Sequence, residues 1–225
     1  MSTLPNVTTR RGESNPPSIR FTPDAFPEAK SSKTGVSVRY VPASDKKWFV
    51  FRVSYGREDK ASDYLVEDGT YTYIAKKIAE KYVEGKRKRY LQTLIPNLLF
   101  AYITAEKAEE YVRKTPSISY LSYYYNHFKQ DEYLKNPPLI IPDEEMYRFI
   151  LATCNMNKHL LFVQPSQCHF KGGEQVRIID GAFAGVEGRV ARVAGQQRVV
   201  ISLSGIGLIS TAYIPTAFIR RIDSD

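Results

Sequence analysis

Cysteine and histidine are scarce in this chain of 225 residues. The two cysteines, Cys154 and Cys168, are too few for a disulfide framework, so we expect free thiols in a reducing compartment. The histidines lie far apart, at His127, His159 and His169, with no acidic or cysteine partner at ligand spacing. A site built from His159 and the two cysteines fits no structural zinc pattern. The sequence therefore predicts no metal and no other cofactor.

Long apolar runs are also missing. No stretch approaches the roughly 18 apolar residues that cross a bilayer. Residues 1–20 lack the apolar core of a signal peptide. The hydrophobic fraction of 43% is still sufficient for packed cores. We therefore expect a soluble, cytoplasmic protein without a membrane partner, built from about two domains.

Motifs of catalysis are absent from the sequence as well. There is no Gly-x-x-x-x-Gly-Lys phosphate loop, and Gly205-Ile206-Gly207 is typical of a turn rather than of a dinucleotide loop. The acidic runs at 109–110 and 143–145 fit a helix surface and a helix first turn. No acid–base pair stands out. We predict a protein that is not an enzyme.

Positive charge is abundant, with a formal net charge of +8. The sharpest cluster is Lys86–Arg89, which follows Lys76, Lys77 and Lys81. We interpret residues 84–89 as a basic loop. Such a cluster suits work close to nucleic acid, and it equally fits a solvated loop. The sequence leaves both interpretations open.

The composition divides the chain into segments. Residues 1–45 are rich in proline, serine and threonine without periodicity, which predicts a disordered N-terminal arm. Residues 46–154 predict one α+β domain, an antiparallel sheet with helices mainly on one face. The expected strands cover 47–53, 71–78, 90–94, 98–103 and 118–125, and the expected helices cover 57–67, 105–114 and 143–154. Residues 155–169 are interpreted as a linker.

The last segment, residues 170–222, has short β-branched runs separated by glycines, which predicts a small, SH3-like β-barrel. Gly181, Gly185 and Gly188 mark places that need positive φ or a close backbone approach. Phe183 is expected to fold back over the barrel mouth. The β-branched runs disfavour helix, so we expect a permanent barrel. A barrel this small cannot enclose a substrate, and its function must lie on its surface.

Three pieces of the sequence occur in an informative order. They are the Trp48-led strand with Gly56 before a helix, the run Ile95-Pro96-Asn97-Leu98-Leu99-Phe100, and the glycine-rich turn at 180–188. Together they resemble the NusG family of transcription elongation factors, which pair a NusG-like domain with a KOW domain. The resemblance covers about residues 46–222.

Within that family the chain looks most like the UpxY-type antiterminators of capsular polysaccharide operons. The signals are the N-terminal arm, the loop at 126–138 and the stretch at 204–214. The resemblance implies a specialised factor that binds RNA polymerase and promotes processive antitermination. Two alternatives stay open: a general NusG-type elongation and termination factor, and a ribosome- or RNA-associated KOW protein.

The resemblance also implies a polymerase-binding surface. In the family an apolar patch docks on the clamp helices of the largest polymerase subunit. The matching residues here are Phe49, Phe51, Ile95, Pro96, Leu98 and Phe100. Ile95 and Leu98 stand where the family usually has aromatics. By strand alternation, about half of this set is expected to be core.

Further partners follow from the same resemblance. Specialised members touch the non-template DNA strand near the first helix, and the matching residues here are Arg57, Lys60, Arg113, Lys114 and Thr115. A solvated helix face is the alternative interpretation, because Glu58 and Asp59 dilute the charge. The barrel would bind a ribosomal protein or a termination factor. The protein is expected to be a monomer.

Overall fold

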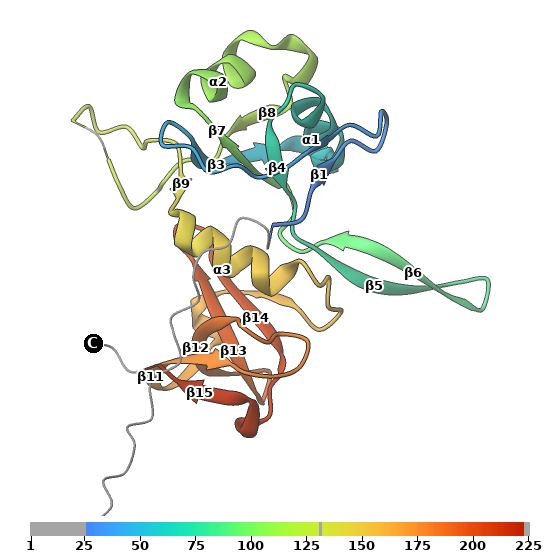
Figure 1. Cartoon of the computed structure of the whole chain (residues 1–225), viewed down its shortest axis with the longest axis vertical. Coiled ribbons are helices and arrows are strands. Elements are labelled where there is room, and N and C mark those ends of the chain that lie inside the picture. The colour runs from blue at the N-terminus through green and yellow to red at the C-terminus, as the bar shows by residue number, and fades with distance from the viewer. Residues whose placement is uncertain (1–25, 131, 223–225) are drawn as a thin grey trace, which may run out of the picture.

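The structure is a computed structural model that describes residues 26–130 and 132–222 (Figure 1). It has an α+β N-terminal domain, a β-rich C-terminal domain, and a projecting hairpin. The expected α+β class with antiparallel sheets is confirmed. Within the described ranges, no helix is long and apolar enough to cross a membrane.

The N-terminal domain is built on an antiparallel sheet in the order β4-β7-β3-β8, with β9 also paired to β3. These strands are β3 (Lys47–Val53), β4 (Tyr71–Tyr73), β7 (Leu98–Ile103), β8 (Leu121–Tyr123) and β9 (Ile140–Ile141). All six residues of β7 are buried, as are five of the seven in β3. These two strands therefore form the centre of the sheet and are covered on both faces.

One face of the sheet packs against α1 (Glu58–Glu67) and α2 (Ala105–Glu109), the latter continued by a π-helical stretch (Glu110–Lys114). Phe49 and Phe51 point to this side, because side chains alternate along a strand. Val50, between them, packs with α3 (Asp143–Thr153) on the opposite face. Helices thus cover both faces, where the sequence predicted mainly one.

Residues 26–45 form part of this fold, contrary to the predicted disordered arm. Phe26 and Tyr40 are buried and stack on Trp48, with ring centroids 6.0 and 5.7 Å away. Ser32 donates two hydrogen bonds to the Asp63 carboxylate on α1. The short strands β1 (Ala29–Lys30) and β2 (Ser37–Val38) pair with each other. Aromatic stacking offsets the ordering entropy that proline-rich composition alone leaves uncompensated. Residues 1–25 of the predicted arm lie outside the described residues.

The C-terminal domain is a six-stranded antiparallel sheet in the order β10-β14-β13-β12-β11-β15. Its strands are β10 (Leu161–Val163), β11 (His169–Ile178), β12 (Glu187–Val193), β13 (Gln196–Leu203), β14 (Gly207–Tyr213) and β15 (Ile219–Arg221). Because β10 pairs with β14, the barrel starts inside the range predicted as linker. The connection from α3 to the barrel is correspondingly short.

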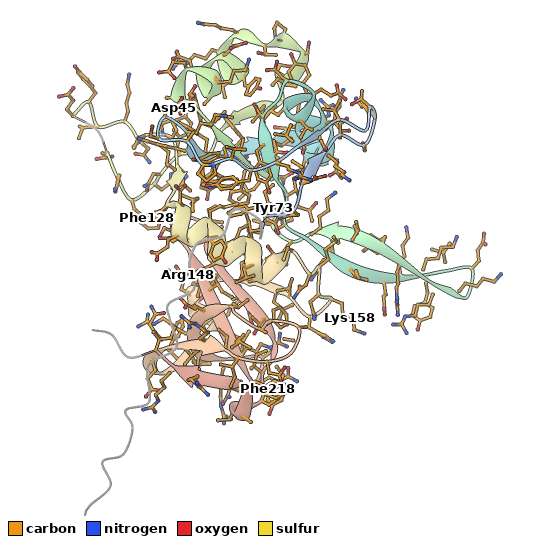
Figure 2. The ribbon with its side chains drawn as sticks, in the orientation of Figure 1. Asp45, Tyr73, Phe128, Arg148, Lys158 and Phe218 are labelled. Carbon is orange, nitrogen blue, oxygen red and sulfur yellow. The ribbon has the colours of Figure 1, made fainter. Side chains whose placement is uncertain are left out.

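Helix α3 lies between the two domains (Figure 1). Its Phe149 contacts Phe100 of β7, with ring centroids 5.3 Å apart. The same buried cluster continues into the barrel through Val199 and Ile201 of β13. Figure 2 places Arg148 of α3 at this junction. One continuous apolar core therefore joins both domains.

A hairpin of β5 (Lys76–Val83) and β6 (Lys86–Thr93) projects from the N-terminal domain (Figure 1). Two sequence predictions are wrong here. The expected strand 71–78 divides between the main sheet and the hairpin, and Lys86–Arg89 lies on β6 rather than in a loop. Glu84 and Gly85 alone make the turn, with φ of 52° and 73°. Two consecutive left-handed residues are what a two-residue hairpin turn needs.

Candidate functional site

The corner between β6 and β7 is held against the start of α1. The backbone N–H of Asn97 donates to Glu58 Oε1 at 2.7 Å, and the Val53 N–H donates to the Asn97 carbonyl at 2.9 Å. Asn97 takes a left-handed φ of 64°, a conformation that asparagine tolerates better than most residues. Pro96 and Asn97 are exposed, whereas Ile95 and Leu98 on either side are buried. The corner thus presents Pro96 to solvent on a fixed backbone.

The structure does not gather the six predicted polymerase-binding residues on one surface. Phe49 and Phe51 are buried against α1 and α2. Ile95, Leu98 and Phe100 belong to the core on the α3 side. Five of the six are therefore buried, more than the half expected from strand alternation. Four of them lie on the central strands β3 and β7, which are packed on both faces, and Ile95 lies in the buried segment before β7. Pro96 remains accessible.

Beside the corner, the turn before α1 carries exposed aromatic and basic side chains. Tyr55 is 86% exposed and has a left-handed φ of 63°, followed by Gly56 at 62°. The Arg57 guanidinium lies 5.4 Å from the centroid of Tyr55 and 5.1 Å from that of Tyr120. Lys60 Nζ lies 5.6 Å from the Tyr120 centroid. A strained, exposed tyrosine beside the Arg57 guanidinium indicates a binding function rather than a packing one.

We refer to Tyr55, Arg57, Lys60 and Tyr120 as the first-helix surface. Burial raises the pKa of the Tyr120 hydroxyl, and nearby Arg57 opposes that shift. Sequence reasoning identified Arg57 and Lys60 but missed both tyrosines. The sequence Tyr55-Gly56 could have indicated an exposed turn at Tyr55. Tyr120 lies beside Arg57 and Lys60 only because of the tertiary fold, and no local pattern predicts that.

The other predicted DNA-binding residues are Arg113, Lys114 and Thr115. Arg113 is exposed and pairs with Glu109, N to O 3.5 Å. The Thr115 hydroxyl donates to the Glu110 carbonyl, which ends the π-helical stretch. Lys114 is exposed. In residues 26–130 and 132–222, no hydrogen bond or ion pair connects these three to the first-helix surface.

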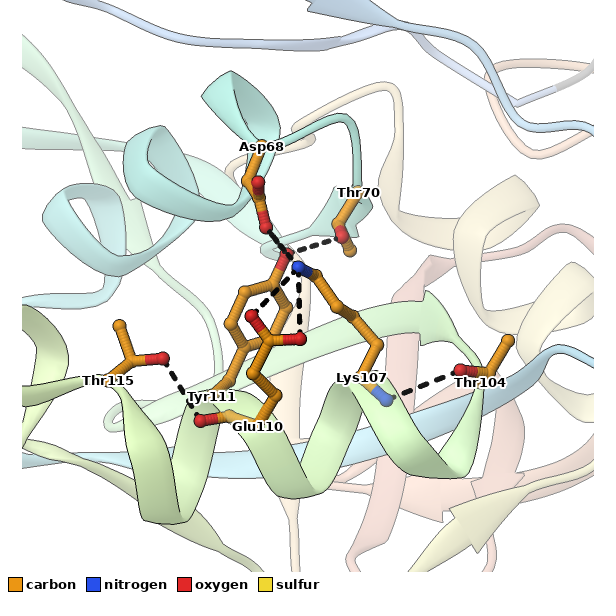
Figure 3. Close-up of polar contacts among 7 residues, drawn as sticks. All are labelled: Asp68, Thr70, Thr104, Lys107, Glu110, Tyr111 and Thr115. Carbon is orange, nitrogen blue, oxygen red and sulfur yellow. Dashed lines mark hydrogen bonds and ion pairs between the residues drawn. The ribbon is translucent and has the colours of Figure 1, made fainter.

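A polar network fixes α2 relative to α1 (Figure 3). Lys107 Nζ lies 2.8 Å from Asp68 Oδ2, and the Tyr111 hydroxyl donates to the same oxygen at 2.7 Å. Tyr111 also hydrogen-bonds Thr70 at 2.8 Å. The hydrogen bond from Lys107, and then that from Tyr111, lowers the pKa of the Asp68 carboxyl. Thr104 caps α2 by accepting from the Lys107 N–H.

The glycine-rich barrel turn has the conformations that the sequence analysis expects. Gly181 and Gly185 have φ of 82° and 88°. A Cβ on Gly188 would lie 2.5 Å from the Val200 carbonyl oxygen, which requires glycine there. Phe183 is buried among the barrel residues.

Polar contacts complete the junction between the domains. Glu145 of α3 accepts two hydrogen bonds from Ser204, at 2.9 Å from the backbone N–H and 2.8 Å from the hydroxyl. Asn155 Nδ2 donates to the Ala182 carbonyl at 2.7 Å. A Cβ on Gly205 would lie 2.8 Å from Cδ1 of buried Leu139, in the N-terminal domain. The barrel loop at Gly205 thus contacts the N-terminal domain closely.

Substitution Gly205→Ala tests this junction. We expect it to lower the free energy of unfolding by about 1–2 kcal/mol more than Gly195→Ala. Both glycines have φ of 77°, so the backbone penalty is shared, but Gly195 has no atom within 4 Å of its Cβ position. Urea unfolding measures the difference, and hydrogen exchange at Leu139–Ile141 should quicken only in Gly205→Ala. If the two substitutions lowered the free energy of unfolding equally, the contact between Gly205 and Leu139 would contribute nothing to stability.

The fold and its exposed turns define the class of this protein. The chain is an α+β domain joined to a small barrel, with Tyr55 and Pro96 on exposed turns. Residues 46–150 match the family model described as transcription termination factor nusG. Over this range, just under half of the chain, the sequence is similar to the NusG family, whose members are transcription factors and not enzymes; this supports the expectation that the protein is not an enzyme.

Curated relatives agree with the family match. Proteins from Streptococcus pyogenes serotypes M1, M3 and M18 are each named transcription termination/antitermination protein NusG. Each is 26% identical to this chain over 172 residues, covering 72% of this chain and 89% of the relative. The similarity therefore extends beyond the N-terminal domain.

Proposed function

We propose that this protein is a transcription elongation factor that binds RNA polymerase through its N-terminal domain and promotes antitermination. The observation that carries the proposal is the NusG match over residues 46–150, which contains both the Pro96 corner and the first-helix surface. The names of the Streptococcus pyogenes relatives support the same role. As a cytoplasmic monomer, the factor would act by binding alone.

The proposed mechanism uses binding energy to shift a conformational equilibrium of the polymerase. The N-terminal domain would hold the clamp helices of the largest subunit in a closed state, and pausing would become less frequent. Pro96 is the exposed contact point, and Glu58 ties its corner to the turn that bears Tyr55. A rigid corner loses little entropy on docking, which favours affinity.

The first-helix surface is the proposed contact for the non-template DNA strand. Arg57 and Lys60 supply charge for phosphates, and Tyr55 offers an exposed ring on which a base can stack. Arg113, Lys114 and Thr115 would form a separate, second contact. The geometry favours the first group because its cations and aromatic rings lie together.

The barrel is the proposed site for a second partner, a ribosomal protein or a termination factor. Its exposed apolar side chains include Phe170, Ile179 and Tyr213. A partner bound there would be held near the polymerase at a raised effective concentration. The more specific proposal is a factor dedicated to a polysaccharide operon, for which the packed segment 26–45 and the loop at 126–138 are the supporting features. A general NusG-type factor is the second candidate, supported by the 89% coverage of the relatives.

Transcription in vitro tests the proposal. We expect the protein to raise readthrough of a terminator by purified polymerase, and Pro96→Asp to weaken polymerase binding at least about ten-fold, because a charge enters a desolvated contact. Pro42→Asp is the matched control, since Pro42 is also exposed but lies on the N-terminal segment. Readthrough limited to a polysaccharide-operon leader would favour the specialised role.

Aspartate at Ile95 and Leu98 would be a poor test, because both side chains are about 95% buried and the variant would lose its fold. Native thermal stability of Pro96→Asp must therefore accompany the binding assay. If stable Pro96→Asp binds polymerase as tightly as wild type, the corner is not the docking point. If wild type neither binds polymerase nor changes readthrough, the proposed function is wrong.

A further inference from the structure

The projecting β5–β6 hairpin carries a charge distribution that the proposed function does not use. Between residues 76 and 93 the sequence has seven lysines and arginines against two glutamates. The eight paired positions of each strand extend the ribbon about 26 Å, at roughly 3.3 Å per residue. Figure 2 shows the side chains of its outer part standing clear of both domains. Packing therefore does not account for the identity of these residues.

The strand register divides the charges between two faces. Side chains alternate along each strand, and directly paired residues share a face. Lys81 pairs with Lys88, and the same face carries Lys77, Lys86 and Tyr90. Glu80 pairs with Arg89, so it lies on the opposite face together with Arg87. We name these the lysine face and the arginine face.

The charge of the arginine face is partly neutralised by carboxylates of the chain. Glu80 forms ion pairs with both Arg87 and Arg89. The hydrogen bond from Arg87 lowers the pKa of the Glu80 carboxyl. Lys76, also on this face, pairs with Asp59 of α1 at 2.5 Å. This face therefore has its partners within the chain.

The lysine face has no such compensation. In the part of the chain that the structure describes, no carboxylate forms an ion pair with Lys77, Lys81, Lys86 or Lys88. Lys77 donates to the Leu160 carbonyl near the base of the ribbon, and Lys81 lies 5.4 Å from the centroid of the Tyr90 ring. Lys81, Lys86 and Lys88 are exposed. Like charges on neighbouring strands repel, and an anionic partner would remove that cost.

We propose that the lysine face of the hairpin binds the phosphate backbone of duplex DNA. A two-stranded ribbon matches the width of the B-form major groove, about 12 Å. Lysines act as point charges on phosphates without the bidentate geometry that reads bases, so the contact is independent of sequence. The site differs from the first-helix surface in both residues and ligand, and the proposal does not depend on polymerase binding.

Two features favour duplex DNA over other nucleic acids. Single-strand sites alternate cations with open aromatic platforms, whereas the lysine face has one aromatic ring, Tyr90, and Lys81 lies against it. The major groove of A-form RNA is too narrow for a ribbon. We therefore assign duplex DNA as the ligand of the lysine face.

Fluorescence anisotropy with the full chain and a labelled 20-base-pair duplex of mixed sequence tests the proposal. The triple substitution Lys81→Gln, Lys86→Gln and Lys88→Gln should weaken binding at least about ten-fold near 0.1 M salt. It should also reduce the slope of log K against log salt by about 3, since each phosphate contact contributes about 0.9. The matched control, Lys33→Gln, Lys47→Gln and Lys129→Gln, removes the same charge from exposed positions elsewhere.

The outcomes separate the alternatives. Binding that falls only in the hairpin variant, with unchanged circular dichroism, supports the proposal. Equal losses in both variants would show that net charge alone binds DNA and would overturn it. Tighter binding to a 20-nucleotide single strand overturns the duplex assignment. Binding to vesicles of phosphatidylcholine and phosphatidylserine (3:1) without duplex binding also overturns it. No arm contains polymerase, so failure here is distinct from failure of the proposed function.

Discussion

Replacing Phe149 with alanine should lower the free energy of unfolding by about 3–5 kcal/mol. Its ring is fully buried on α3, 5.3 Å from the Phe100 ring centroid and 5.9 Å from that of Tyr73. Truncation removes the favourable transfer free energy of burying the ring. It also leaves a cavity that the closely packed residues around it can fill only in part. Because α3 also packs on β13, the loss is shared by the sheet and the barrel.

Urea unfolding measures this effect through Trp48, which is the sole tryptophan and lies in the same core. Phe128→Ala is the matched control, since Phe128 is 84% exposed and the same truncation should change stability by less than about 0.5 kcal/mol. If the domains unfold as one unit, fluorescence and far-UV circular dichroism should coincide. A loss below about 1 kcal/mol for Phe149→Ala would contradict the shared core.

Gly188→Ala should destabilise the barrel by about 3 kcal/mol, at the severe end of small-to-large substitutions. The added Cβ would lie 2.5 Å from the Val200 carbonyl oxygen and 2.9 Å from Val199 Cγ1. A backbone oxygen cannot rotate away as a flexible side chain does, so β12 and β13 must separate where Arg189 pairs with Val200.

The measurement for Gly188→Ala is the urea midpoint, supported by hydrogen exchange along β12 and β13. Gly195→Ala controls for the general effect of alanine in this hairpin, since its Cβ position is open; its φ of 77° still carries a backbone penalty. The order of destabilisation should be Gly188→Ala above Gly195→Ala. Equal midpoints would show that the strands can shift apart at little cost.

Much of the fold follows from local patterns. The aromatic and β-branched residues of Lys47–Val53 and the apolar run Leu98–Ile103 identify the two central strands. The i, i+3, i+4 spacing in the first and last helices predicts α1 and α3 within a residue or two. The glycine turn at 181–188 predicts a tightly bent β-domain because few other residues fit those φ values and that close approach.

The sequence predictions were wrong where contacts between distant segments decide whether a residue is ordered, paired in a strand or buried. The proline-rich stretch 26–45 lacks periodicity, yet Phe26 and Tyr40 are ordered by stacking on Trp48. Lys86–Arg89 resembles a solvated loop in sequence, and its pairing with β5 makes it a strand. About half of the apolar residues around Pro96 were expected to be core, yet Ile95, Leu98 and Phe100 are all buried, in a cluster that includes residues of α3, which begins 47 residues after Pro96.

The sequence by itself determined the two-domain α+β and β-barrel organisation and the resemblance to NusG, because strand alternation, helix period and glycine conformation are local properties. Only the tertiary structure decided which residues are accessible, that α3 joins both domains in one core, and that four lysines share one face of a projecting ribbon. Exposure and shared faces depend on contacts between segments far apart in the chain, and no local pattern records those contacts.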